Sequence, residues 1–223
     1  MTEYAELHCL SNYSFLRAAS HPEELVERAH ALGYRALAIT DECSLSGVVR
    51  AHEKATDLGL QLIIGSEIQL QDGPRLVLLA TDRASYGRLS CLITRGRRSS
   101  PKGTYRLVYE DFQDALPGCL ALLIPPVDYR LPDDQLVWFR ETFSGRGWLA
   151  IELLRDGRDL ERLKRLRRYG RDFELPLVAA GNVIMHRRQR RALHDLLSAI
   201  RLNTPVSRLG LALNANGERH LRR

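Results

Sequence analysis

Short apolar runs with the character of β-strands alternate with amphipathic helical segments along this 223-residue chain. Strands that alternate with helices pair mainly in parallel, because each helix carries the chain back to the starting edge of the sheet. The pattern therefore predicts an α/β fold with a largely parallel sheet, and the number of strands favours a barrel over an open sheet. The expected strands lie at about 4–10, 36–40, 61–70, 75–80, 119–124, 148–153 and 176–180.

The sequence contains signals for the start and the end of the first helix. Ser20-His21-Pro22-Glu23 has the form of a capping box with proline in the first turn, and Gly33 is placed to end the helix. The polar stretch 95–105 is rich in glycine and serine and is expected to be an exposed loop.

Two later helices, expected at 158–173 and 187–202, are rich in arginine and carry apolar stripes. Residues at such helical spacing usually face the core, so we expect both stripes to be buried. The expected core positions of the three helices are Leu25, Val26, Ala29, Leu32, Leu160, Leu163, Leu166, Leu193, Leu196, Leu197 and Ile200.

The cysteines and the N-terminal residues indicate a cytoplasmic protein. The four cysteines have no Cys-x-x-Cys spacing, which favours free thiols in a reducing compartment. The first residues are acidic and lead directly into a strand, with no apolar stretch long enough for export or for a membrane span.

Basic residues are concentrated toward the end of the chain. Residues 155–223 hold 17 Lys and Arg against 7 Asp and Glu. Such an excess suits a polyanion, but the composition itself favours solvated helix faces, and four arginines within little more than one helical turn fan out rather than form a stripe. The candidate DNA-facing residues are Arg95, Arg97, Arg98, Arg187, Arg188, Arg190 and Arg191.

Polar residues follow or end several of the expected strands. In a β/α barrel these positions meet at one rim, where one histidine and several carboxylates make a cleft for a cation or a phosphate. The alternative is that each residue anchors a loop or caps a helix. The candidates are His8, Thr40-Asp41-Glu42, Gly65-Ser66-Glu67, Glu152 and Gly181-Asn182.

Six segments agree in order and spacing with one known family. They are Glu6-Leu7-His8-Cys9-Leu10-Ser11-Asn12-Tyr13-Ser14-Phe15-Leu16-Arg17, Ala38-Ile39-Thr40-Asp41-Glu42-Cys43-Ser44-Leu45-Ser46-Gly47, Gly65-Ser66-Glu67, 92–98, 179–186 and 216–222. Together they resemble the PHP (polymerase and histidinol phosphatase) domain of bacterial polymerase alpha subunits, in particular the error-prone branch. The resemblance implies a distorted TIM-like (β/α)7 barrel over residues 1–206, with 207–223 beginning the connection to a polymerase body.

Active members of that family hold a metal cluster on the barrel rim and hydrolyse phosphate esters. The resemblance implies that His8 and Glu67 are retained and that Glu42 replaces a histidine ligand. Other ligand positions are lost, and two of them carry arginine, whose charge repels cations. We therefore expect no metal, with Arg17 and Arg75 pairing with Glu42 and Glu67 in its place. The residual site positions are His8, Asp41, Glu42, Glu67 and Asn182, and the lost-ligand positions are Leu10, Arg17, Arg75 and Ile184.

The function implied by the resemblance is that of an error-prone, translesion-type DNA polymerase, with roles in replication, repair and the damage response. In that family the catalytic Mg²⁺ is held by a polymerase palm domain, which this chain lacks. The resemblance therefore implies that the chain is a domain fragment or the product of a truncated reading frame. Expected partners are the remainder of the polymerase chain, DNA through the parent enzyme, and other translesion or replication accessory proteins. Two readings remain for the chain itself: a non-catalytic structural domain, or a residual Zn²⁺- or Mn²⁺-dependent phosphoesterase or proofreading exonuclease with His8, Glu42 and Glu67 as ligands.

Overall fold

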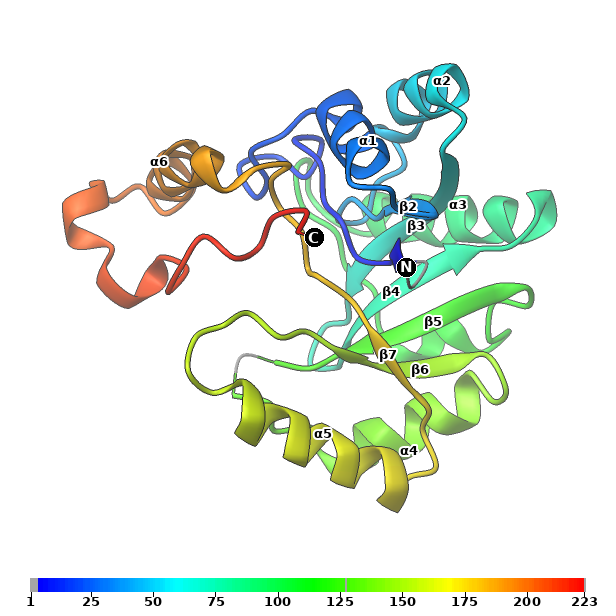
Figure 1. Cartoon of the computed structure of the whole chain (residues 1–223). Helices are drawn as coiled ribbons and strands as arrows, with labels where there is room; N and C mark the ends of the chain where they lie inside the picture. The colour runs from blue at the N-terminus through cyan, green and yellow to red at the C-terminus, as the bar shows by residue number, and fades with distance from the viewer. Residues whose placement is uncertain (1–3, 127, 223) are drawn as a thin grey trace.

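The fold is built on one seven-stranded sheet whose strand order follows the sequence. The computed structural model describes residues 4–126 and 128–222. In Figure 1 the sheet curls into a half-barrel, so the predicted α/β fold of the TIM-like PHP type is confirmed. The strands are β1 (Ala5–Glu6), β2 (Ala36–Ile39), β3 (Gln61–Gln69), β4 (Arg75–Ala80), β5 (Cys119–Ile124), β6 (Gly147–Ile151) and β7 (Leu177–Ala179).

The two edges of the sheet meet through a single backbone bridge. Cys9, just after β1, pairs in parallel with Val183, just after β7. Leu10 N donates to the Val183 carbonyl at 2.8 Å, and Val183 N donates to the His8 carbonyl at 2.9 Å. This bridge brings the segments that follow the first and last strands together at one rim.

One strand runs against the direction of the others. β4 is antiparallel to both β3 and β5, whereas the remaining neighbours pair in parallel. The connection from β3 to β4 is a short turn in which Leu70 N bonds to the Pro74 carbonyl and Asp72 takes a positive φ of 54°. A turn of that length allows only a hairpin, because a parallel pair needs a long crossover.

Helices cover the outer side of the sheet. In Figure 1, α1 and α2 lie beside β2, and α4 and α5 lie at the opposite end near β6 and β7. The helices are α1 (Pro22–Ala31), α2 (Val48–Leu58), α3 (Arg83–Arg98), α4 (Asp133–Thr142), α5 (Asp159–Asp172) and α6 (Arg191–Arg201), with short 3₁₀ turns η1 (Tyr109–Phe112), η2 (Arg188–Arg190), η3 (Val206–Arg208) and η4 (Gly210–Ala212).

The apolar core is divided by the sheet. The largest cluster lies between the sheet and α3, α4 and α5, and includes Leu89, Leu136, Phe139 and Leu166. A second joins β2 to α1 and α2, and a third fills the concave side with Val77, Leu122 and Ala150. Leu25, Val26 and Ala29 are fully buried on α1, as expected, and Leu32 packs against the same cluster.

Helix α1 begins one residue later than the sequence predicted. His21 is the N-cap, and its backbone N–H donates to Glu24 Oε2 at 2.9 Å. The expected cap, Ser20, accepts instead from the backbone N–H of His186 at 2.9 Å. Gly33 lies just past the helix with a φ of 75°, where it was expected.

The predicted burial of the α6 stripe is wrong. Leu193, Leu196 and Ile200 are 37%, 51% and 57% exposed, and only Leu197 packs against a buried cluster. On α5, Leu166 is buried but Leu160 is 68% exposed. The expected loop at 95–105 is also partly wrong, because α3 continues to Arg98.

Two simpler expectations concern the cysteines and the membrane. The cysteines are free, and Cys9, Cys43 and Cys119 are buried while Cys91 is exposed. Within residues 4–126 and 128–222, the helices are too short or too polar to cross a membrane.

Candidate functional site

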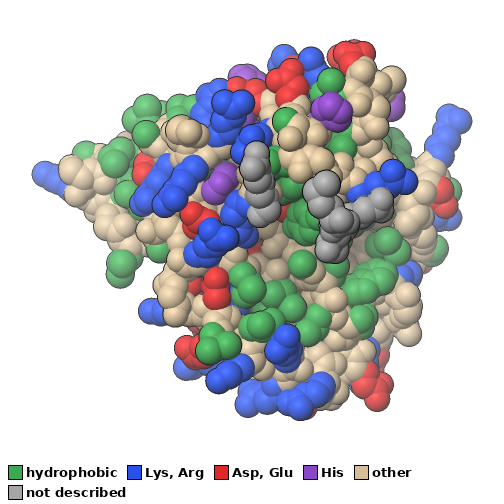
Figure 2. Space-filling view, viewed as in Figure 1, with side chains coloured by type: hydrophobic (Ala, Val, Ile, Leu, Met, Phe, Trp, Pro, Cys, Tyr) green, Lys and Arg blue, Asp and Glu red, His purple; other side chains and the backbone are tan. Residues whose placement is uncertain are grey.

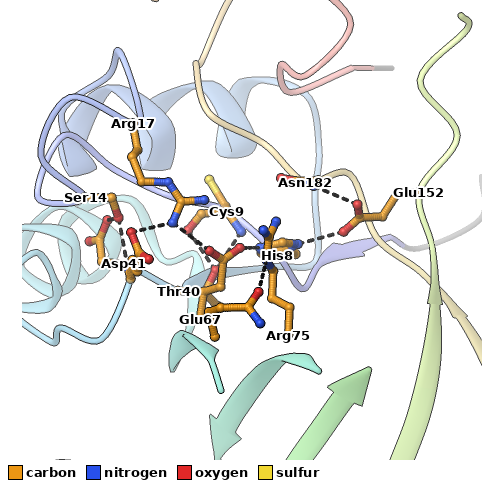
Figure 3. A network of polar contacts seen from close by, with 12 residues as sticks. His8, Cys9, Ser14, Arg17, Thr40, Asp41, Glu67, Arg75, Glu152 and Asn182 are labelled. Atoms are coloured by element: carbon orange, nitrogen blue, oxygen red, sulfur yellow. Dashed lines mark hydrogen bonds and ion pairs between the residues drawn. The ribbon is translucent and has the colours of Figure 1, made fainter. Parts of the chain in front are cut away.

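His8 lies at the centre of a buried polar network on the rim of the half-barrel (Figure 3). It follows β1, is fully buried, and contacts Glu67 Oε2 through Nε2 and Glu152 Oε1 through Nδ1, each at 2.8 Å. Burial by itself lowers the pKa of His8, but the hydrogen bonds and charges of the two carboxylates outweigh it and raise the pKa to about 9. His8 is therefore an imidazolium at neutral pH that donates to a carboxylate from each ring nitrogen.

Arg17 holds two carboxylates of this rim together. Its Nη1 forms an ion pair with Glu42 and lies 3.0 Å from Glu67 Oε1. Burial alone would raise the pKa of Glu67, but His8 and the charges of Arg17 and Arg75 hold it far below its ordinary value. Glu67 therefore stays ionised, with an imidazolium on one oxygen and a guanidinium beside the other.

Arg75, the other arginine expected at a ligand position, acts at longer range. It begins β4 and donates from Nε to Gln69 Oε1 at 3.3 Å. Among the described residues no carboxylate is within ion-pair distance of it, although its charge contributes to the low pKa of Glu67. The expected direct pairing of Arg75 with Glu42 or Glu67 is thus absent from the described structure.

A third arginine, which sequence reasoning did not select, completes the network from the end of the chain. Arg219 donates from Nε to the Asn182 backbone carbonyl at 2.9 Å and from Nη2 to the Asn182 side-chain oxygen. Asn182 in turn donates from Nδ2 to Glu152 Oε2 at 2.7 Å. Arg219 belongs to the segment 216–222, and its position within a family-like motif was the only signal available.

Leu10 and Ile184, two positions where the resemblance implies a lost ligand, are apolar partners in the structure. Leu10 and Ile184 are 0% and 1% exposed and belong to one small cluster with Ala18, Ala19 and Met185. The cluster occupies the rim where the resemblance places histidine side chains. Aliphatic side chains are favourable there because both positions are buried away from water.

Asp41 and Glu6 have structural partners. Asp41 accepts from the Ser11 backbone N–H at 2.8 Å and from the hydroxyls of Ser11 and Ser14 at 2.7 Å each, so it fixes the loop after β1. Glu6 accepts from the backbone N–H groups of Gly181 and His8 at 2.8 Å and 3.0 Å. Burial raises the pKa of both carboxyls.

The donor set does not fit a metal cluster. Both nitrogens of His8 are directed at carboxylates, and Arg17 pairs with one oxygen of Glu42 and one of Glu67. A divalent cation would have to displace a guanidinium and deprotonate His8, whose carboxylate partners favour the charged form. Over residues 4–126 and 128–222, no group of three or more His, Cys, Asp or Glu side chains is arranged to hold a metal ion.

The candidate DNA-facing arginines fall into two groups. Some are engaged inside the molecule: Arg97 donates to the carbonyls of Cys43 and Glu42, Arg190 pairs with Glu24, and Arg191 lies 3.6 Å from Asp195. Others have exposed side chains. The exposed ones are Arg95, Arg98, Arg187 and Arg188, of which Arg95 lies 3.5 Å from Asp111 and Arg188 lies 3.5 Å from Glu218.

Comparison with known proteins agrees with this architecture. The PHP domain family matches residues 6–136. The chain is 55% identical over 222 residues to the "Error-prone DNA polymerase" of Pseudomonas aeruginosa, and 53% identical over 221 residues to that of Methylococcus capsulatus. These matches cover 100% and 98% of this chain but 21% of each relative, so the chain spans about a fifth of the curated relatives it matches.

A solved structure supports the fold. The crystal structure of a protein assigned as a metal-dependent phosphoesterase from Bifidobacterium adolescentis superposes with a TM-score of 0.61 at 17% identity, covering 82% of this chain and 88% of that one. At that identity the likeness concerns the fold.

Proposed function

The chain belongs to the PHP domain family, and on that basis we propose that it is the PHP-domain part of an error-prone DNA polymerase, where it serves as a structural domain rather than as a hydrolase. Identity of about 55% to error-prone polymerases along the chain supports the first half of the proposal. The second half is supported by the rim, where the guanidinium of Arg17 and the imidazolium of His8 form ion pairs with the carboxylates.

The ion pair of Arg17 with Glu42 and Glu67 is the main observation that supports a structural domain over a hydrolase. A metal-dependent phosphoesterase needs carboxylates and neutral imidazoles free to coordinate, and it needs an open coordination position for water. Here the central histidine is charged, and Arg17 pairs with one oxygen of Glu42 and one of Glu67. These contacts argue against the residual phosphoesterase or exonuclease alternative.

Metal analysis and hydrolysis assays test this reading together. We expect the purified chain to retain less than a tenth of an equivalent of zinc or manganese after dialysis. We also expect background hydrolysis of a phosphodiester substrate and of single-stranded DNA ends. Stoichiometric metal accompanied by hydrolysis that Glu67→Gln abolishes and Glu161→Gln does not would refute the structural reading.

The exposed stripe of α6 supports docking of the remainder of the polymerase chain. Leu193, Leu196 and Ile200 lie at helical spacing and are solvent-exposed, and Figure 2 shows hydrophobic side chains gathered over α6 at the upper left. An amphipathic face without a partner is costly to leave in water. Because the relatives are about five times longer than this chain, we assign the covering partner to polymerase sequence beyond the matched region.

A charge placed on α6 tests this docking. Ile200→Glu should leave the stability of the 223-residue chain within about 0.5 kcal/mol, because the side chain is exposed. In a full-length polymerase of this family the same change should lower the melting temperature, whereas Val49→Glu, on exposed α2, should not. Destabilisation of the short chain, or no effect in the long one, would contradict the assignment.

The cellular role follows from the parent enzyme. We propose cytoplasmic DNA synthesis across damaged sites during replication and repair, with Mg²⁺ held by the polymerase body and with accessory proteins recruited by it. The palm carboxylates of such an enzyme lie outside this chain, so the 223-residue chain should extend no primer. Primer extension with this chain alone, compared with a full-length relative, measures this directly.

A further inference from the structure

A small polar hollow lies apart from the His8 network, between α1 and the turn before α6. It has a volume of about 420 Å³ and is lined by Arg28, Arg187, Arg188, Gln189 and His220. Three guanidinium groups from two separate segments face this space, with an imidazole from a third segment. Figure 2 shows Lys and Arg side chains gathered in the region between α1 and α6.

The arginines of this hollow are poorly compensated. Arg28 Nε is buried and has no hydrogen-bond partner in the described structure. Among the residues at 4–126 and 128–222, no carboxylate lies within ion-pair distance of Arg28 or Arg187. A buried donor without a hydrogen-bond partner is unfavourable, so an oxygen acceptor placed beside Arg28 would be stabilising.

The nearest carboxylates are already shared among several cations. Glu218 lies 3.5 Å from Arg188, 3.7 Å from Arg155 and 3.6 Å from Arg222. Glu24 pairs with Arg190 and lies 3.7 Å from His186. Neither is free to neutralise Arg28 or Arg187, so the region keeps a positive excess.

The hollow is held in shape by contacts outside it. His220 forms a parallel backbone bridge with Met185 and donates from Nδ1 to the Gly217 carbonyl at 2.9 Å. A side chain at Gly217 would come within 3.0 Å of Arg188 Cγ, so the glycine lets the arginine stem pass closely. Arg190, paired with Glu24, ties the same turn to α1.

We propose that this hollow binds a phosphate group. Arginine forks match phosphate oxygens in geometry and charge, and the lining carries donors rather than an apolar surface. The site is distinct from the His8 network and does not depend on the proposed polymerase role. Its phosphate comes from a nucleic-acid backbone or from a free phosphate or nucleotide, and these sources share the same chemistry.

Calorimetry with the 223-residue chain at low salt tests the site. The probes are inorganic phosphate, dATP and a single-stranded 12-mer oligonucleotide. Arg28→Gln with Arg187→Gln should weaken binding at least tenfold. The matched control, Arg167→Gln with Arg171→Gln on α5, removes the same charge from exposed positions and should change affinity less than twofold.

The pattern across probes identifies the source. Binding of phosphate and dATP without the oligonucleotide supports a site for free phosphate. Binding of the oligonucleotide, with the slope of log K against log salt about two smaller for the paired variant, supports backbone phosphates. Equal losses in the two paired variants, or no binding of any probe at millimolar concentration, would overturn the proposal.

A second measurement avoids the question of whether the variants fold. Phenylglyoxal modifies accessible arginines, and mass mapping of the unmutated chain shows which ones react. A bound probe should protect Arg28 and Arg187 and leave Arg167 reactive. Uniform protection, or protection absent at saturating probe, would count against the site.

Discussion

Arg219 donates two hydrogen bonds to Asn182, one to its backbone carbonyl and one to its side-chain oxygen. Asn182 has a positive φ of 48°, in the left-handed region, and its side-chain amide donates a hydrogen bond to Glu152. From there the polar contacts continue through His8 and Glu67 to Arg17 (Figure 3). The end of the described chain and its first turns are thus joined by one network.

Removal of Arg219 should loosen that network. Arg219→Gln shortens the side chain, so it leaves the oxygens of Asn182 without their donors in a buried position. We expect the free energy of unfolding to fall by about 2–3 kcal/mol, measured by urea denaturation. Arg208→Gln, an exposed arginine of the same C-terminal region, should cost less than about 0.5 kcal/mol. Equal effects of the two changes would argue against the network.

Reversal of the charge at position 17 should make the stability of the chain depend on a bound divalent cation. Arg17→Asp places a third carboxylate beside Glu42 and Glu67 and removes their counter-ion, so we expect a loss of about 3 kcal/mol in metal-free buffer. Millimolar Mn²⁺ should raise the melting temperature of this variant and leave that of the unchanged chain the same. Arg50→Asp, at an exposed pair with Glu23, serves as the control.

The charge on His8 predicts a loss of stability at alkaline pH. The folded pKa of about 9 lies above the ordinary 6.5, so His8 contributes stability fully below about pH 6.5 and loses it as pH rises through 9. We expect the free energy of unfolding to drop by roughly 2–3 kcal/mol between pH 6.5 and 9. At the acid end, Glu67 has a lowered pKa, so its contribution is present above about 4.5 and is lost only in stronger acid.

Two variants isolate the His8 contribution in urea denaturation. In His8→Gln, the free energy of unfolding should fall much less between pH 6.5 and 9 than in the unchanged chain. In His52→Gln, at an exposed position, it should fall as much as in the unchanged chain. His186, His194 and His220 have lowered pKa values in the folded state, so their unfolded forms bind more protons near pH 6.5 and their contribution to stability rises with pH, opposite to the expected decline. A decline that persists in His8→Gln would show that another group causes it.

Introduction of a single histidine at position 10 should destabilise the fold. Leu10 is fully buried against Ile184 in an apolar cluster, so Leu10→His buries a polar ring without a partner. We expect a loss of about 3 kcal/mol in urea denaturation, against less than about 1.5 kcal/mol for Leu10→Met, which keeps the volume and the apolar character. If the two variants proved equally stable, the apolar cluster would not be what seals the rim.

The strands could be predicted because their apolar runs are short and bounded by turn residues, and all seven expected strands are present. The direction of β4 was missed, although the short connection from 70 to 74 already excluded a crossover. The stripe on α6 shows the limit of periodicity. Spacing identifies an amphipathic helix but does not say whether its partner lies within the same chain.

Site prediction was limited by contacts that have no local pattern. His8, Glu67 and Glu152 were chosen because they follow or end strands, and the structure brings them together. Arg219 was not chosen, because no spacing rule connects it to Asn182. Its position depends on how the segment after α6 folds back, where Leu221 is buried against β2 and α1.

The Arg219 contact has a consequence for synthesis of the chain. The N-terminal half of the rim leaves the ribosome early, but the two oxygens of Asn182 receive their Arg219 donors only when residue 219 has emerged. We expect a nascent chain halted before Arg219 to be more open to proteases at its first loop than the finished chain, because Asn182 would then lack both of these donors.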